Sequence, residues 1–238
     1  YYRLVCPKDF DPSKKYPLIV YVYGGPHSQM VRNSWMGQIR AWEVRMAQLG
    51  YFVYVQDNRG TSNRGAAFEK AINRACGQAE MADQMAGLNA LLDRCPWLDR
   101  DRIGVHGWSY GGFMTISLFT NYPDVFKVAL AGGPVIDWKW YEVMYGERYM
   151  DTPETNPEGF ELTSLMNQTQ NVHGKLLICQ GAIDNTVVWE HSLSFVQKCI
   201  MEGVQLDYFP YPCDEHNMKG KARDHLYDKI TGWFTEYL

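Results

Sequence analysis

Segments rich in apolar and β-branched residues alternate along this chain with segments whose apolar residues recur at helical spacing. The first kind predicts strands within 16–25, 51–60, 102–107, 125–134, 174–184 and 204–212. The second kind predicts helices at 39–50, 79–95, 111–123 and 223–238. Strands that alternate with helices form a mostly parallel sheet with helices on both faces, so the pattern predicts an α/β fold.

Length and charge narrow the class of protein. The 238 residues, 46% of them hydrophobic, suffice for one α/β domain over 1–238, whereas two full domains would be cramped. The net charge of −4 indicates no basic stripe, so nucleic acid and anionic membranes are poor candidate partners. No apolar run is long enough to span a bilayer. The opening lacks an initiator Met and a signal peptide, which predicts a segment of a longer protein.

The cysteines do not point to a metal or redox site. Six cysteines are scattered along the chain without a CxxC pair, which argues against a zinc site and a redox dithiol. Their spacing assigns no disulfide, and we expect most of them to be buried or free thiols. The sequence therefore predicts a protein without a metal or a cofactor.

The stretch "HGWSYGGF" at 106–113 raises the first question of chemistry, because it holds Ser109 between two glycines. A bare Gly-x-Ser-x-Gly arises by chance in roughly one chain in ten of this length. Here it follows the expected strand 102–107 and precedes the expected helix 111–123, which is the context of a nucleophile elbow. A purely structural glycine-rich turn is the alternative.

A serine hydroxyl is a poor nucleophile unless a base takes its proton and a carboxylate orients that base. In elbow hydrolases the acid and then the histidine follow the serine along the chain, each after a strand. Asp184 and His216 match this order, although an Asp after a strand is also a common turn former or helix cap. The other histidines fit less well: His106 within a strand as a packed neutral imidazole, His191 and His225 on helices at the surface or core edge, and His27 and His173 in loops.

These residues stand among motifs that resemble the catalytic domain of the prolyl oligopeptidase family, in its dipeptidyl peptidase IV and prolyl tripeptidyl peptidase branch. The motifs are "VYGGPHSQ", "DNRGTSNRG", "GWSYGGF", "GPVIDWKWYEVMYGERYM", "GAIDNTVVWEHS" and "DEHNM". The resemblance covers nearly the whole chain and implies an α/β-hydrolase fold with Ser109 as nucleophile, Asp184 as orienting acid and His216 as general base. It also implies an oxyanion hole formed by the Tyr23 hydroxyl and the backbone N–H of Tyr110. An amphipathic core tyrosine is the alternative for Tyr23.

The aromatic insert at 134–145, "PVIDWKWYEVMY", is the candidate for substrate recognition. A proline ring has no N–H and presents an apolar face, so its pocket should have aromatic and β-branched walls. Without the resemblance, such an aromatic cluster is more often core. By resemblance the pocket residues are Val135, Trp138, Tyr141 and Tyr145, with Tyr110 and Val187 beside them.

Glu142 directly follows Tyr141 in the insert. An exopeptidase must recognise a free ammonium group, and a carboxylate at a set distance from the nucleophile would measure the length of the released peptide. Tripeptidyl members of the family also have a glutamate after this tyrosine. An ion pair with Arg148 and plain solvent exposure are the alternatives.

The resemblance implies a serine exopeptidase that cleaves after a proline near the N-terminus of a peptide and releases a di- or tripeptide through an acyl-enzyme. An oligopeptidase, an acylaminoacyl-peptidase or an esterase with the same triad is the alternative enzyme, and an inactive hydrolase-fold binding domain is the alternative of another class. Family members carry an N-terminal β-propeller, so we expect one in the full-length protein. We also expect peptide substrates, an extracytoplasmic location and a homodimer through the catalytic domain.

Overall fold

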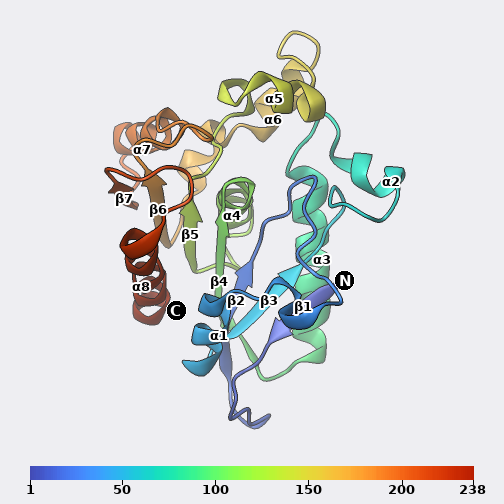
Figure 1. Ribbon diagram of the computed structural model, residues 1–238, viewed down its shortest axis with the longest axis vertical. Helices are drawn as coiled ribbons and strands as arrows, with labels where there is room; N and C mark the ends of the chain where they lie inside the picture. The colour runs from blue at the N-terminus through green and yellow to red at the C-terminus, as the bar shows by residue number, and fades with distance from the viewer.

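A computed structural model gives the backbone of residues 1–238 and describes the side chains of residues 1–36 and 39–238. Its centre is a seven-stranded sheet with the order β1-β3-β2-β4-β5-β6-β7 (Figure 1). Six strands are parallel, and β1 pairs antiparallel with β3. The strands are β1 (Tyr2–Val5), β2 (Tyr16–Tyr21), β3 (Phe52–Gln56), β4 (Leu98–Trp108), β5 (Val128–Gly132), β6 (Lys175–Gly181) and β7 (Asp207–Tyr211).

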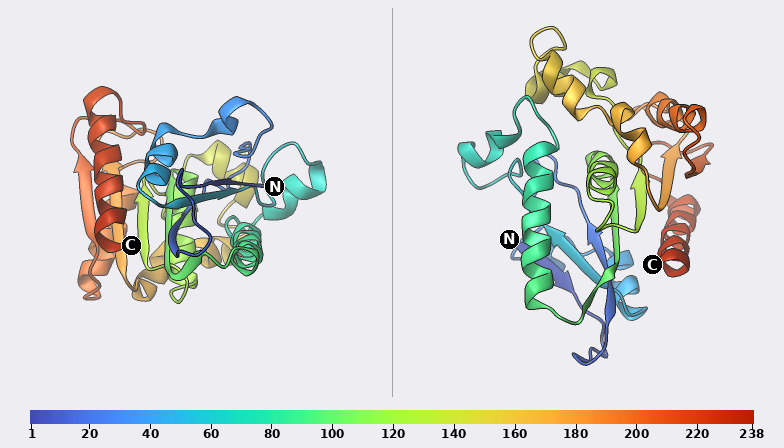
Figure 2. Two further views of the ribbon diagram at one scale, coloured as in Figure 1. Left: turned by 90° about the horizontal axis from the view of Figure 1, so that it is seen from below. Right: turned by 180° about the vertical axis from the view of Figure 1, so that it is seen from behind.

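Helices cover both faces of the sheet, as the alternating pattern predicts (Figure 2). In β2, Leu18 and Val20 join the core cluster beneath α3, α4 and α7, while Ile19 and Tyr21 join the cluster beneath α1 and α8. The helices are η1 (Trp35–Gln38), α1 (Ala41–Gln48), α2 (Ala66–Glu69), η2 (Lys70–Ile72), α3 (Gln78–Arg94), α4 (Tyr110–Asn121), η3 (Trp138–Trp140), α5 (Val143–Met150), α6 (Pro157–Thr163), η4 (Leu165–Asn171), α7 (Glu190–Met201) and α8 (Gly220–Tyr237).

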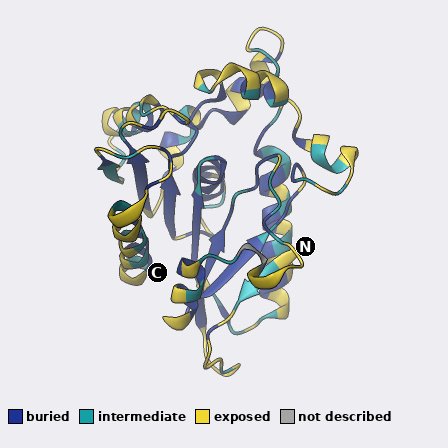
Figure 3. Cartoon of the chain, in the orientation of Figure 1, coloured by how far each residue is buried: buried dark blue, intermediate teal, exposed yellow. Residues whose placement is uncertain are grey.

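Burial follows these layers. The central strands are buried, whereas the outward sides of α5, α6 and α8 are exposed to solvent (Figure 3). The α/β-hydrolase fold class and the predicted strands and helices are confirmed. The elements that were not predicted are the short edge strand β1, the helices α2, α5 and α6, and the 3-10 helices η1 to η4, although Asn156 followed by Pro157 is a helix-start signal before α6. None of the described helices has the length and apolar character that crossing a membrane requires.

The sheet brings the predicted site residues to one edge. In adjacent parallel strands the carboxyl ends meet at the same edge, where ligands of open α/β sheets bind. Tyr23 follows β2, Ser109 follows β4, Asp184 follows β6 and His216 follows β7. Beyond this edge lie α5 and α6, at the top of Figure 1.

Candidate active site

Ser109 sits in a sharp turn between β4 and α4. Its backbone angles, φ 64° and ψ −119°, belong to a region that non-glycine residues rarely adopt, at a cost of about 1–3 kcal/mol. The flanking glycines are required by space, because a Cβ on Gly107 or on Gly111 would lie 2.3 Å from the carbonyl oxygen of Val22. The structure thus has the strand–turn–helix geometry of a nucleophile elbow.

Backbone hydrogen bonds hold this turn in place. The N–H of Ser109 donates to the Gly132 carbonyl at 2.7 Å, and its own carbonyl accepts from the N–H of Phe113 at 3.1 Å. The indole N–H of Trp108 donates to the carbonyl of His216 at 2.9 Å. The residue before Ser109 therefore ties the elbow directly to the loop that carries the histidine.

Asp184 and His216 form a buried pair. The Nδ1 atom of His216 lies 2.6 Å from Oδ2 of Asp184, and both residues are buried. The Asp184 carboxylate also accepts from the backbone N–H groups of Thr186 (2.8 Å) and Val187 (2.9 Å) through Oδ1, and from Nε2 of Gln180 (2.9 Å) through Oδ2. Four donors thus satisfy both oxygens, which fixes the carboxylate against the imidazole.

The pair lies beside the elbow. A Cβ built on Gly133 would lie 3.2 Å from Cε1 of His216, and Gly133 follows the residue that accepts the Ser109 N–H. Among the hydrogen bonds of the described residues, none joins the Ser109 hydroxyl to His216. Such bonds are often long in resting enzymes and shorten when substrate binds. The three residues predicted as a triad are therefore brought together around Gly132 and Gly133.

A small cavity of about 30 Å³ opens at Ser109. Its walls are mainly aromatic: the rings of Trp138 and Tyr145 are stacked with centroids 5.9 Å apart, and Tyr110 lies 5.2 Å from Trp138. The lining residues are Tyr23, Ser109, Tyr110, Val135, Trp138, Tyr141 and Tyr145. Val187 is not among them, because its side chain is fully buried in the core below.

Two polar groups border this cavity near the serine. The ring of Tyr23 lies 6.1 Å from that of Tyr110, and burial raises the pKa of the Tyr23 hydroxyl, so it stays protonated and can donate. Tyr110 is the first residue of α4, where a backbone N–H has no partner within the helix. Both groups predicted as oxyanion donors therefore lie at the serine with protons to donate.

Glu142 lies at the rim. It is exposed and precedes α5, and its Oε2 accepts from the backbone N–H of Met144 at 3.0 Å as a helix cap. The sequence left open an ion pair with Arg148 or plain solvent exposure as alternative roles for Glu142. The side chain is exposed, and the ion pairs of the described residues include none between Glu142 and Arg148. The Glu142 charge contributes to the raised pKa of Tyr141, which burial raises to about 12.

The structure confirms the position predicted for His106 but not the one predicted for His191. His106 is buried with Nδ1 2.9 Å from the Leu130 carbonyl, and burial lowers its pKa to about 4, which confirms a packed neutral imidazole. The surface or core-edge position expected for His191 is wrong. It is fully buried, its Nδ1 accepts from the N–H of Ile136 at 3.0 Å, and burial lowers its pKa to about 4. A neutral His191 therefore supports the start of the aromatic insert.

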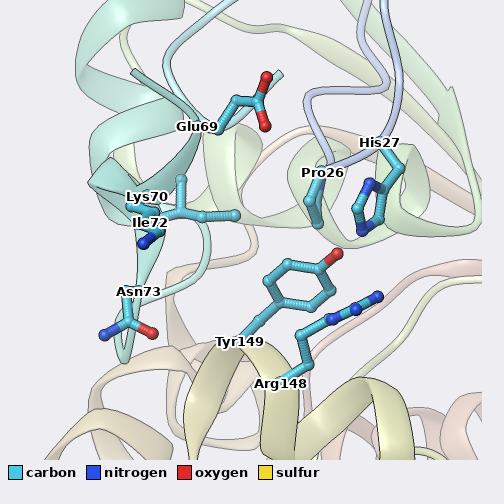
Figure 4. Close-up of a pocket in the computed structure, with 9 residues that line it drawn as sticks. Pro26, His27, Glu69, Lys70, Ile72, Asn73, Arg148 and Tyr149 are labelled. Atoms are coloured by element: carbon cyan, nitrogen blue, oxygen red, sulfur yellow. The ribbon is translucent and has the colours of Figure 1, made fainter. Parts of the chain in front are cut away.

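A second, larger cavity of about 450 Å³ has Tyr149 in its lining (Figure 4). The centroid of the Tyr149 ring lies 4.7 Å from that of Tyr145, which lines the small cavity, and 5.7 Å from that of His27, which lines the large cavity. Its lining mixes charged and apolar groups: Pro26, His27, Gly60, Glu69, Lys70, Ile72, Asn73, Arg148 and Tyr149. No group of three His, Cys, Asp or Glu side chains within the described ranges is placed to hold a metal ion.

Comparison with known proteins identifies the family. The family model described as "Prolyl oligopeptidase family" matches residues 38–238. This chain belongs to the prolyl oligopeptidase family. Human dipeptidyl peptidase 8 is 38% identical over 92% of the chain. A solved structure from Bacteroides ovatus, named "putative dipeptidyl aminopeptidase IV", is 51% identical over the whole chain with a TM-score of 0.98. Dipeptidyl peptidase 4 of Porphyromonas gingivalis is 34% identical over the whole chain with a TM-score of 0.93.

These prolyl oligopeptidase relatives are much longer than the chain described here. The chain spans 25% of the length of human dipeptidyl peptidase 8 and 33% of each of the two bacterial structures. The match therefore assigns the fold and the family, and it leaves the greater part of each relative without a counterpart in this sequence.

Proposed function

We propose that this chain is the catalytic part of a serine exopeptidase that cleaves after a proline near the N-terminus of a peptide. One observation carries the proposal: Ser109, in a strained backbone conformation, lines a cavity with aromatic walls, and the buried Asp184–His216 pair lies beside this serine. The names of the relatives, all dipeptidyl peptidases, support the same activity.

In the first half of the reaction, His216 takes the hydroxyl proton of Ser109 on Nε2 while the serine oxygen bonds to the scissile carbonyl carbon. Asp184 holds Nδ1–H, so that Nε2 is free to accept this proton. The oxyanion that forms accepts hydrogen bonds from the Tyr23 hydroxyl and the N–H of Tyr110. When the C–N bond breaks, His216 returns the proton to the leaving amine, and an acyl-enzyme remains on Ser109.

In the second half, water attacks the acyl-enzyme by the same route. His216 takes a proton from the water, the new C–O bond forms, and the proton then passes to the oxygen of Ser109 as the ester bond breaks. The released product is the N-terminal di- or tripeptide. Both halves of the reaction use the same three side chains, and the hydrogen bond between Asp184 and His216 keeps the imidazole in the same orientation for both.

Specificity follows from the cavity next to the serine. Val135, Trp138, Tyr141 and Tyr145, with Tyr110, offer flat apolar surfaces and no charged group, which suits the compact ring of proline better than a long or charged side chain. Val187 does not line the cavity, and its contribution to the site is the backbone N–H that donates to Asp184. Glu142, exposed at the rim, is available to bind the free amine of the substrate.

The experiment uses the full-length protein with chromogenic amides that carry Pro, Ala or Lys before the scissile bond, and a short-chain ester. We expect the Pro amide to be cleaved fastest, the Ala amide more slowly, and the Lys amide hardly at all. A fluorophosphonate should label Ser109, and the Ser109→Ala variant should remain unlabelled. A preference for Lys, or for the ester over every amide, would replace the proposal with one of the alternative hydrolases, and a protein that resists labelling would be an inactive binding domain.

Two further parts of the proposal concern the whole protein. Homodimerisation through this domain and an extracytoplasmic location both come from the resemblance to the family. Light scattering of the full-length protein and fractionation of the native cells test them directly.

A further inference from the structure

Glu80, the third residue of α3, is a fully buried carboxyl group. Its Oε1 accepts a hydrogen bond of 2.6 Å from the hydroxyl of Tyr110, thirty positions along the chain. None of the ion pairs formed by the described residues includes Glu80. A buried carboxyl group without a cation costs free energy, and replacing both partners of a buried polar pair by apolar side chains of similar volume often leaves a protein at least as stable. Stability alone therefore does not explain a glutamate at this position.

The partner of Glu80 is a wall of the active-site cavity. The Tyr110 ring contacts Phe113 at 5.5 Å and Trp138 at 5.2 Å between centroids. On another side it meets the loop that follows Tyr23, since a Cβ on Gly25 would lie 2.6 Å from Cγ of Tyr110. The ring thus stands between the Tyr23 loop and the aromatic insert, with its hydroxyl held from α3.

We propose that Glu80 is a positioning residue that fixes the Tyr110 ring through its hydroxyl and so determines which side chains fit before the scissile bond. This inference rests on the proposed function, because it assigns Glu80 to the selectivity of the same cavity. Packing alone leaves a ring free to tilt about its χ angles, whereas a hydrogen bond at the hydroxyl adds a fixed point at its far end. A carboxylate acceptor makes that bond a charge-assisted one.

The charge of Glu80 gives the inference a specific signature. Burial raises the pKa of Glu80 to about 7, and burial raises the pKa of the Tyr110 hydroxyl well above its ordinary value. The other titratable groups that interact with Glu80 are Cys76, Asp83 and Arg59. Because the Tyr110 hydroxyl donates throughout this range, the bond should strengthen as Glu80 ionises with rising pH.

The experiment compares four variants of the full-length protein: Glu80→Leu, which removes the acceptor; Glu80→Gln, which keeps an acceptor without the charge; Tyr110→Phe, which removes the donor; and the Glu80→Leu/Tyr110→Phe double variant. Tyr54→Phe is the matched control, because its buried hydroxyl bonds to Gln56 elsewhere in the same core. The readout is the ratio of kcat/KM for Pro and Leu amides. A second readout is the ratio of the rates at which Pro and Leu diphenyl phosphonates label Ser109, which requires no turnover.

We expect the Pro/Leu ratio to fall roughly tenfold in Glu80→Leu and in Tyr110→Phe, as for the loss of one hydrogen bond to a charged group. The double variant should lose no more than either single one, because all three lack the same bond. Glu80→Gln should stay within about threefold of the parent, and Tyr54→Phe should be unchanged. The parent ratio should rise from pH about 6 to about 8 as Glu80 ionises, and this rise should be absent in Glu80→Gln. Titration of His216 cancels in the ratio.

Glu80→Leu leaves the buried Tyr110 hydroxyl without its acceptor and should melt below the parent, whereas the Glu80→Leu/Tyr110→Phe double variant leaves no unpaired group and should melt at the parent's temperature or higher, which separates positioning from a role in folding. Unchanged ratios in Tyr110→Phe, additive losses in the double variant, or equal losses for Pro and Leu reagents would each overturn the inference. If the parent cleaves neither amide but labels selectively, the proposed function fails and the labelling ratios still decide the role of Glu80. If the parent does not label at all, both fail.

Discussion

The replacement Asp184→Asn tests the site most sharply, because the structure dictates which way the new amide must face. Oδ1 accepts two backbone N–H groups, from Thr186 and Val187, so the asparagine must keep its oxygen there. The amide NH₂ then occupies the Oδ2 position, opposite Nε2 of Gln180 and Nδ1 of His216. In the variant, the amide NH₂ group would therefore face two other donors, Gln180 and His216, unless one of these side chains turns an acceptor toward it.

Gln180 is not free to change. Its Nε2 donates to the Val187 carbonyl at 2.9 Å, and its Oε1 accepts from the Ser192 hydroxyl at 2.9 Å, so a flipped amide would lose both bonds. His216 must therefore change its tautomer. Its Nδ1 becomes the acceptor, and the proton moves to Nε2, which is the nitrogen that should take the Ser109 proton. The variant holds the right residues in place with the wrong tautomer.

We expect kcat to fall about ten-thousand-fold, which corresponds to about 5.4 kcal/mol of transition-state free energy, with little change in KM. The assay is steady-state hydrolysis of the Pro amide by the full-length protein, together with the rate of fluorophosphonate labelling. Asp57→Asn is the control, because Asp57 is also buried and also accepts two backbone N–H groups, from Met30 and Val31, but does not contact a histidine. An Asp184→Asn variant within tenfold of the parent would refute the tautomer reasoning.

Four further single variants and one double variant test the other proposed roles. Ser109→Ala and His216→Ala should each lower kcat by about a million-fold, and the double variant no further, because the triad acts as a unit; a nearly active His216→Ala would move the base to another histidine. Tyr23→Phe should lower kcat by about 10²–10³ with KM unchanged, as for one oxyanion donor; a raised KM with kcat preserved would make Tyr23 a binding residue. Glu142→Gln should lower kcat/KM for peptides with a free amine by roughly ten- to a hundred-fold relative to N-acetylated ones, and equal effects on both would leave the amine to groups outside this chain.

The elbow and the order of the site residues could be predicted from the sequence because they depend on neighbours along the chain. The glycines at 107 and 111 stand where the turn leaves no room for a Cβ, and the strand and helix beside them follow from local apolar spacing. Asp184 and His216 could be placed because the ends of adjacent parallel strands share one edge, so strand order carries the spatial relation.

Contacts between distant segments were decided only by the tertiary structure. The apolar spacing that predicts α3 makes Glu80 an ordinary polar position of that helix. The residues around Glu80 in the sequence give no sign that α3 packs against Tyr110, the residue after Ser109. Likewise, His191 is buried because the aromatic insert closes over α7 and donates to its ring. Local periodicity follows from backbone geometry, which each residue carries with it. Which two faces meet, and which buried polar groups then find partners, depends on the packing of the whole sheet and its helices.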